Sequence, residues 1–380
     1  MDKKITKIGT ISLGLNTIDL NFGAILHNYA IVEFLKRQGY NAECIDYIPN
    51  FAVGFNAKFP FLYYIKKGKL KSFLRTMLIF RSFRERYNKF EDFKKRYMTI
   101  SKNTYSEKTL SNTKLDYDVV IAESDVIWSV WFTGGDLEKA FFLDLPSMKH
   151  IKKIAYSPSL GDSKPEAGSN LENRFAECIK NIDFVSVRES YSIPYLESVS
   201  GRMDIAHVLD PVFLLDKLYY ENMVIDNKRF TQNKYLLVYL PVGDNKKLIA
   251  QAEKFAQERN LEIIELSTKK IKRKHKVFFD VRVEEFISLI KNADIVFTNS
   301  FHAICFSLIF SVNFYAFSRR NGGKVLDICK QFNLENRLFE DDKFVEQEDI
   351  DWADINTMLK LKVDFSRQWL LNAINNNKNC

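Results

Sequence analysis

Short apolar runs alternate with longer amphipathic segments along most of the chain, in the pattern of repeated strand–helix units. A continuous apolar run of roughly four to eight residues is typical of a parallel strand covered on both faces, whereas a period near 3.6 residues indicates a helix. We expect strands at residues 8–13, 42–47, 118–122, 153–157, 184–187 and 205–209, and then at 235–240, 262–266, 295–297 and 314–317. We expect helices at residues 24–37, 171–181 and 191–199, and then at 246–259, 283–291, 303–310 and 323–332.

A polar, irregular stretch at about residues 216–233 separates the two series and marks a domain boundary. The chain of 380 residues exceeds the size of one ordinary hydrophobic core, which also favours two domains. The fold class predicted is α/β, with two Rossmann-like, doubly wound domains and a central cleft. We place the N-terminal domain at residues 1–222, with a basic helical insert at about 58–97, and the C-terminal domain at 223–340. The segment 341–380 has a helical pattern, and we expect it to cross back to the first domain.

One apolar run changes its period near residue 300. Residues 295–297 have the pattern of a buried strand, the next three form a polar turn that ends in the N-cap candidate Ser300, and residues 303–310 have the pattern of a buried helix. His302 then lies in the first helical turn, where unpaired backbone N–H groups and the helix dipole favour an anion such as phosphate or carboxylate. The alternative is that Ser300 only caps a core helix and His302 is a packing residue.

Polar residues follow several other predicted strands. In open parallel sheets, ligands bind beyond the carboxyl ends of the strands, so these residues are candidates for a binding site. Arg188 can make a bidentate contact with a carboxylate or phosphate, although an ion pair with Glu189 is the alternative, and Asp210 can equally belong to a turn before Pro211. The candidates are Asn16, Asn21, Ser124, Asp125, Ser157, Ser159, Arg188 and Asp210.

The net charge of +8 is concentrated in one segment. Residues 58–97 contain 13 Lys and Arg against three acidic residues, interleaved with aromatic residues in a helix-like pattern. Three interpretations remain open: a pair of solvated helices, a surface that rests on an anionic bilayer, and a surface that binds nucleic acid. No recognised nucleic-acid motif accompanies the charge, so we expect no nucleic-acid partner.

Several common motifs are absent from the sequence. The five cysteines are scattered, and neither they nor the five histidines have metal-ligand spacing, so we expect no metal site and a reducing, cytoplasmic location. We find no Walker loop, no dinucleotide-binding glycine pattern and no GxSxG elbow. The start of the chain lacks the apolar core of a signal peptide, and no apolar stretch is long enough to span a bilayer.

Seven segments, in order along the chain, resemble the polysaccharide pyruvyl transferase family. They are NFGAILHNYAIVEFLKRQGYNAECIDY near the start, ESDVIW at 123–128, KKIAYSPSLG at 152–161, FVSVRES at 184–190, HVLDPVFLL at 207–215, ADIVFTNSFHAICFSLIF at 293–310 and NGGKVLDICKQFNLENRL at 321–338. The resemblance covers the chain from the first strand to about residue 340, except for the basic insert.

This resemblance implies a glycosyltransferase-B-like fold and an activity. Family members transfer the enolpyruvyl carbons of phosphoenolpyruvate to a sugar, commonly as a ketal, with no separate cofactor. The expected acceptor is a sugar of a surface polysaccharide or of its polyprenyl-linked precursor, reached in the cytoplasm, with peripheral contact at the inner face of the anionic membrane. The alternatives are a nucleotide-sugar glycosyltransferase of the same fold and a non-catalytic glycan-binding relative.

The resemblance also implies roles for individual residues. His302 matches the family histidine that meets the donor phosphate and supplies a proton, and Asp125 matches a family aspartate that we expect to act as a base. Arg188 and Phe301 match family residues at the donor. We also expect Ser300, Asn21 and Ser159 to bind substrate, because they follow predicted strands. Three positions depart from the family pattern: Ala303 stands where glycine is usual, Asn299 where aspartate is common, and Glu123 where glycine is usual.

Overall fold

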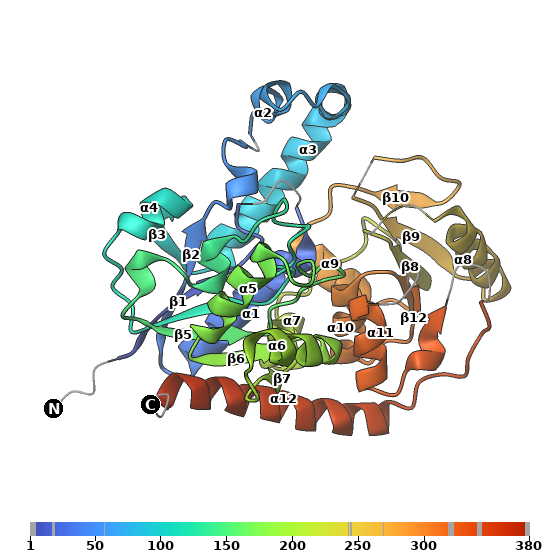
Figure 1. Ribbon diagram of the computed structural model, residues 1–380. Helices are drawn as coiled ribbons and strands as arrows, with labels where there is room; N and C mark the ends of the chain where they lie inside the picture. Colours follow the sequence, from blue (N-terminus) through green and yellow to red (C-terminus); the bar gives the residue numbers. More distant parts are fainter. Residues whose placement is uncertain are drawn as a thin grey trace. The chain divides into compact units, whose positions relative to one another are not determined.

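The computed structural model describes residues 5–16, 20–56, 58–241, 243, 245–268, 270–317, 323–339 and 344–376. Contacts between residues divide the chain into two compact units. Unit 1 comprises residues 1–54, 96–215 and 361–380, and unit 2 comprises residues 55–95 and 216–360. Each unit contains a parallel sheet flanked by helices (Figure 1). The fold class of two Rossmann-like α/β domains is therefore confirmed.

Unit 1 is built on a seven-stranded sheet in the order β3-β2-β1-β4-β5-β6-β7, and every pair of neighbours is parallel. The order reverses direction between β1 and β4, which makes the carboxyl ends of these two strands the topological switch point. The strands are β1 (Lys7–Ile11), β2 (Asn41–Tyr47), β3 (Ile100–Tyr105), β4 (Val119–Glu123), β5 (Lys152–Tyr156), β6 (Phe184–Val187) and β7 (Ala206–His207).

The helices of unit 1 begin and end where the sequence supplies caps. α1 (Phe22–Arg37) starts after Asn21, whose side chain accepts hydrogen bonds from the N–H groups of Gly23 and Ala24, and it ends just before Gly39, which has a φ of 86°. The other helices are α4 (Glu107–Asn112), α5 (Asn170–Lys180) and α6 (Ile193–Ser200), and short 3₁₀ turns lie at Asn50–Ala52, Lys139–Phe142, Pro146–Met148, Ser190–Ser192 and Pro211–Leu214.

Unit 2 has a six-stranded sheet in the order β10-β9-β8-β11-β12-β13, again with parallel neighbours. Its switch point lies between β8 and β11. The strands are β8 (Tyr235–Tyr239), β9 (Glu262–Leu266), β10 (Lys276–Phe278), β11 (Ile295–Thr298), β12 (Phe314–Phe317) and β13 (Leu338–Phe339). The helices include α7 (Lys217–Glu221), α8 (Lys246–Glu258), α9 (Val283–Lys291), α10 (Phe301–Phe310) and α11 (Gly323–Gln331), and a 3₁₀ turn lies at Glu335–Arg337.

The basic segment forms α2 (Phe61–Lys66) and the long helix α3 (Leu70–Tyr97). We expected it as an insert of the first domain, but residues 55–95 group with unit 2. The guanidinium of Arg86 donates to the carbonyl oxygens of Ser267 and Phe279, and the ammonium of Lys89 lies 3.0 Å from a carboxylate oxygen of Asp280. These contacts fasten the second half of α3 to the loops around β9 and β10.

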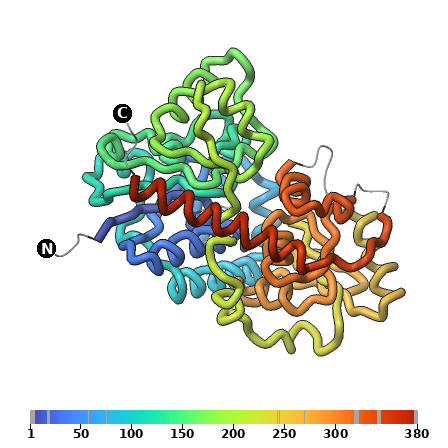
Figure 2. Tube along the Cα trace, turned by 90° about the horizontal axis from the view of Figure 1, so that it is seen from below, coloured from blue at the N-terminus to red at the C-terminus, as the bar shows by residue number. Residues whose placement is uncertain are grey.

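The last helix that the structure describes is α12 (Trp352–Asn375), which is continuous (red in Figure 2). Its residues from 361 onward belong to unit 1. There the hydroxyl of Ser366 accepts from the backbone N–H of Leu209 at 3.0 Å, and Arg367 donates to the carbonyl of Leu214 at 3.0 Å. The guanidinium of Arg367 also lies over the ring of Phe34, so α12 helps to cover α1. Residues 340–343, where we placed the end of the second domain, lie outside the described residues.

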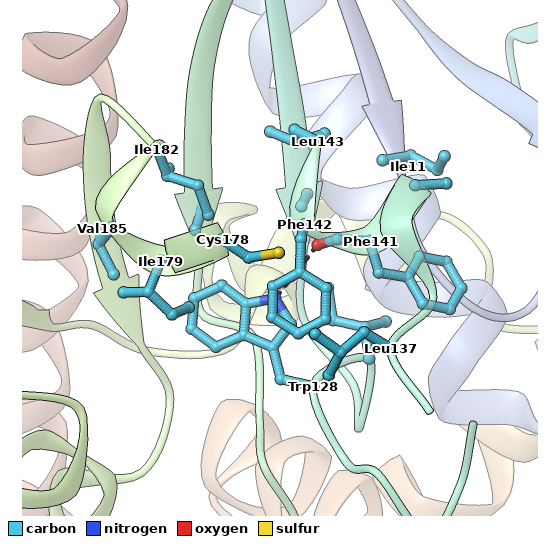
Figure 3. Packing of buried hydrophobic residues seen from close by; sticks show 14 of the residues in the cluster. Ile11, Trp128, Leu137, Phe141, Phe142, Leu143, Cys178, Ile179, Ile182 and Val185 are labelled. Atoms are coloured by element: carbon cyan, nitrogen blue, oxygen red, sulfur yellow. Dashed lines mark hydrogen bonds between the residues drawn. The ribbon is translucent and has the colours of Figure 1, made fainter. Parts of the chain in front are cut away.

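Trp128 occupies the centre of an apolar cluster in unit 1 (Figure 3). Its indole is 1% exposed and stacks on the ring of Phe142, with centroids 5.6 Å apart, and Phe175 meets it edge-on. The indole N–H donates to the carbonyl oxygen of Phe141 at 3.1 Å. This packing anchors the loop that follows β4. Of the helices that the structure describes, none is both long and apolar enough to cross a membrane.

Candidate functional site

The switch point of unit 1 carries two consecutive residues in the left-handed backbone region. Directly after Glu123, the last residue of β4, Ser124 has a φ of 46° and Asp125 a φ of 51°. Residues other than glycine rarely adopt this backbone region. Each such position costs of order 1–3 kcal/mol of conformational free energy, and these positions cluster at functional sites. Several hydrogen bonds hold the turn. The backbone N–H of Ser124 donates to the carbonyl of Tyr156, and the Ser124 hydroxyl donates to Asp210. The N–H of Val126 donates to the Asp125 carboxylate, and the N–H of Ser159 donates to the carbonyl of Asp125.

Ser159 follows β5, Asn21 precedes α1, and both side chains serve the local backbone. The fully buried Ser159 donates its N–H to the carbonyl of Asp125 at 2.8 Å and accepts a hydrogen bond from Gly161 at its hydroxyl. Asn21 is exposed and caps α1 through its side-chain oxygen, which leaves its amide NH₂ group oriented away from the helix N–H groups. Ser159 therefore positions Asp125, and Asn21 is the more accessible of the two.

A buried histidine supports this turn from α1. His27 is fully buried, and its Nδ1 lies 2.8 Å from a carboxylate oxygen of Glu123, while its Nε2 lies 3.8 Å from a carboxylate oxygen of Asp125. Burial alone would lower the pKa of His27, but the charge of Glu123, the nearby carboxylate of Asp125 and the hydrogen bond to Glu123 outweigh it and raise the pKa to about 10. Burial raises the pKa of Glu123 to about 7, which His27 offsets only in part. The cluster therefore holds an imidazolium at neutral pH beside Asp125, whose side chain is 12% exposed.

Stability should fall with rising pH because of this imidazolium. The folded-state pKa of His27 is raised, so its contribution is fully present below the unfolded pKa near 6.5 and is lost as the pH rises through about 10. Between about pH 7 and pH 9 we expect the wild type to lose roughly 1 kcal/mol per pH unit, which is about 2–4 °C in melting temperature. The variant His27→Gln should show a flatter slope in the same thermal melts; equal slopes would contradict a charged His27.

Arg188 follows β6 and is 1% exposed. Its Nε lies 2.7 Å from a carboxylate oxygen of Glu189, and one terminal nitrogen lies 3.1 Å from a carboxylate oxygen of Asp210. Burial disfavours the charged guanidinium, but these two carboxylates outweigh it, and the pKa of Arg188 lies above its usual value. The ion pair with Glu189 that we considered from the sequence is present, and it is buried rather than on the surface. Asp210 accepts hydrogen bonds from both Arg188 and Ser124, so it links β6 to the turn after β4.

The switch point of unit 2 contains the turn predicted around residue 300. β11 ends at Thr298, whose hydroxyl donates to the carbonyl of Tyr239 on β8 and accepts from the N–H of Ser300. Ser300 is the N-cap of α10, and its hydroxyl accepts from the N–H of Ala303 at 3.3 Å. The predicted cap is confirmed. Ala303 is fully buried in a regular helical turn, so the absence of glycine there leaves the helix start intact.

His302 and Phe301 occupy the first turn of α10, as the sequence predicted. Phe301 is 3% exposed and His302 is 7% exposed, and their rings meet edge-on with centroids 5.2 Å apart. Every residue of α10 is buried, and the helix accordingly has no polar face. The imidazole therefore lies buried at the positive end of a helix that is itself buried along its whole length.

Each unit thus gathers predicted residues at its own switch point. Asp125, Ser159 and Arg188 belong to one hydrogen-bonded network in unit 1, and Ser300, Phe301 and His302 are consecutive in unit 2. Sequence reasoning did not assign roles to His27 and Glu123, which are 96 residues apart. Both lie inside segments that resemble the family named above, NFGAILHN and ESDVIW, and this resemblance is the signal that could have pointed to them. Among the residues described, no group of three or more His, Cys, Asp or Glu side chains is arranged to hold a metal ion.

Comparison with known proteins extends these observations. No curated protein sequence matches the chain at a significant level. Solved structures with a similar fold include UDP-N-acetylglucosamine 2-epimerase from Rickettsia bellii, with 10% identity, a TM-score of 0.52 and coverage of 97% of both chains. The UDP-GlcNAc 2-epimerase of Neisseria meningitidis and a glycosyltransferase from Rickettsia africae each have 9% identity, a TM-score of 0.50 and coverage of 98% of this chain and 95% of theirs. At such low identity the likeness shows the fold alone, which is of the glycosyltransferase-B type.

The family comparison is more specific. The sequence pattern of the family described as polysaccharide pyruvyl transferase matches residues 21–321. This range begins at the cap of α1, includes the turn after β4 and the start of α10, and covers most of the chain. The chain therefore belongs to the polysaccharide pyruvyl transferase family.

Proposed function

We propose that the protein transfers a pyruvyl group from phosphoenolpyruvate to a sugar of a surface polysaccharide or of its lipid-linked precursor, and that the product is a pyruvate ketal. The observation that carries the proposal is the position of His302 in the first turn of α10, capped by Ser300 at the switch point of unit 2. A helix N-terminus with an imidazole suits a compact, multiply charged donor such as phosphoenolpyruvate. Family membership supports the same donor.

The proposed reaction has two additions at the same carbon. A proton adds to the methylene carbon of phosphoenolpyruvate, and the positive charge that develops at C2 is attacked by an acceptor hydroxyl, which loses its proton to a base. The bond between C2 and the phosphate oxygen then breaks, a second hydroxyl attacks C2, and its proton leaves with the phosphate. The balance is one donor and two hydroxyls giving one ketal and one inorganic phosphate. We assign His302 to the donor phosphate and to proton delivery.

The groups of unit 1 have different proposed roles. Asp125 is the candidate base, because its carboxylate is partly exposed at a strained turn and is oriented by its contacts with His27 and with the N–H of Val126. His27 and Ser159 position it, and the exposed Asn21 amide is available to a sugar hydroxyl. The charge of Arg188 is balanced by Glu189 and Asp210, so we propose that it supports the reaction indirectly, by holding Asp210 against Ser124.

Ligand-dependent melting separates this function from its first rival. Phosphoenolpyruvate at about 100 times its dissociation constant should stabilise the folded protein by about 2.7 kcal/mol, which corresponds to roughly 5–10 °C in melting temperature. A nucleotide-sugar glycosyltransferase of the same fold would instead be stabilised by a nucleotide sugar. A melting temperature that responds to UDP-sugars and not to phosphoenolpyruvate would reject the proposed donor.

Product analysis separates the function from a non-catalytic glycan-binding relative. Ala303 and Asn299 depart from the family pattern beside His302, which makes this rival specific to the chain. Inorganic phosphate should be released from phosphoenolpyruvate only when a sugar acceptor is present, and the sugar should gain the mass of the ketal. Glycan binding without phosphate release would support the non-catalytic alternative.

A further inference from the structure

The helices α2 and α3 expose an unusual amount of apolar surface. Of the 17 large hydrophobic residues that are exposed in the described part of the chain, seven lie between residues 59 and 78. On α3 they are spaced at intervals of four, three and one residues, which places them on one face of the helix. The seven are Phe59, Leu62, Ile65, Leu70, Leu74, Met77 and Leu78.

This apolar surface is surrounded by positive charge. Residues 58–84 contain eight Lys and Arg and no Asp or Glu. The exposed bases include Lys66, Lys67, Lys69 and Lys71 at the junction of α2 and α3. The acidic residues of α3 begin only at Glu85, which lies 3.2 Å from Arg81, and the next, Glu91, lies 2.6 Å from Lys94.

Aromatic contacts on the other side of the helices set their orientation. The ring of Phe61 on α2 meets the rings of Phe73 and Phe80 on α3, with centroids 5.9 Å and 4.8 Å apart. Figure 1 shows α2 beside the first half of α3. Because the second half of α3 is fastened to unit 2 through Arg86 and Lys89, the pair is attached at one end. Leu74 and Leu78 therefore stay exposed while the phenylalanine rings hold the two helices together.

We propose that α2 and the first half of α3 form a docking surface for an anionic lipid bilayer, with the aliphatic side chains entering the interface and the lysines meeting lipid phosphates. The charge and the apolar character of the surface together favour this partner. Leucine and methionine side chains that are flanked by basic residues, with no acidic residue among them, match the interface of an anionic membrane. Nucleic acid would satisfy the lysines but not the aliphatic face. In a dimer through this surface, two copies of the same positively charged segment would face each other and repel.

Sedimentation with vesicles tests the proposal on the full-length protein. Vesicles of phosphatidylcholine with about one third phosphatidylglycerol should bind the protein at about 0.05 M salt and release most of it at about 0.5 M, and pure phosphatidylcholine should bind far less. The double variant Leu74→Glu, Leu78→Glu should lower the partition coefficient by about 100-fold or more. Each of Lys66→Gln, Lys67→Gln and Lys69→Gln should lower it by about fivefold.

Met203→Glu is the matched control. Met203 is 83% exposed, like Leu78 at 84%, but it lies in unit 1 and outside the basic segment. Its replacement should leave vesicle binding unchanged. The proposal is overturned if the wild type stays in the supernatant at low salt, or if the double variant Leu74→Glu, Leu78→Glu binds vesicles as well as the control Met203→Glu does. It is also overturned if light scattering shows a dimer of the wild type that Leu78→Glu dissociates. Because binding is measured without substrates, its failure is independent of the proposed pyruvyl transfer.

Discussion

The variant His302→Ala should lose about 10²- to 10⁴-fold in turnover while remaining folded. The reason is that a positioned acid or base typically contributes a factor of this size, and we assign both phosphate contact and proton delivery to this imidazole. The side chain is 7% exposed at the start of α10, and Ser300 caps the helix independently through the N–H of Ala303. The measurement is the rate of phosphate release from phosphoenolpyruvate in the presence of the sugar acceptor.

Two comparisons make this result interpretable. His150→Ala removes an exposed histidine of unit 1 and should leave the rate unchanged. A melting temperature of His302→Ala close to that of the wild type would show that the loss of rate is not a loss of fold. A rate within threefold of the wild type would exclude His302 from the chemistry.

The variant Arg188→Met should be strongly destabilised. Removing the guanidinium leaves the carboxylates of Glu189 and Asp210 buried beside each other without their counter-charge. Breaking a buried ion pair by removing one partner costs about 3–5 kcal/mol, which corresponds to roughly 6–20 °C in melting temperature. Thermal or denaturant unfolding of the purified variant measures this loss directly.

An exposed arginine provides the matched control. Arg174 lies 2.9 Å from Asp136, but its side chain is 45% exposed, so Arg174→Met should cost about 1 kcal/mol or less. If Arg188 instead served mainly to bind the donor, its replacement would raise the KM for phosphoenolpyruvate and leave the melting temperature unchanged. That outcome would contradict the structural role that its two ion pairs indicate.

The central strands of both sheets could be predicted because they are apolar throughout. All five residues of β8 and of β4 are buried, and the predicted ends of the central strands agree with the structure to within about two residues. The strands that the sequence analysis missed are β3, β10 and β13, which lie at sheet edges. β3 reads ISKNTY and has exposed residues in its middle, so it carries neither an apolar run nor a clear alternation. Its pairing with β2 is decided by the sheet that it joins.

The basic segment shows a similar limit. Its helical pattern and charge are visible in the sequence, and the structure contains α2 and α3 there. Its assignment to unit 2 depends on hydrogen bonds from Arg86 and Lys89 to residues about 180–190 positions later in the chain. No local pattern encodes such partners.

The chain by itself determined the elements whose causes are local. The turn after β11, the cap at Ser300 and the place of His302 in the first turn of α10 follow from residues that are neighbours in sequence. The tertiary structure alone decided which ionisable groups meet in unit 1. His27 contacts Glu123 from 96 residues away, and Arg188 contacts Asp210 from 22 residues away. Periodicity reports which face of an element is buried, whereas the pairing of buried charges depends on which strand ends the sheet order brings together.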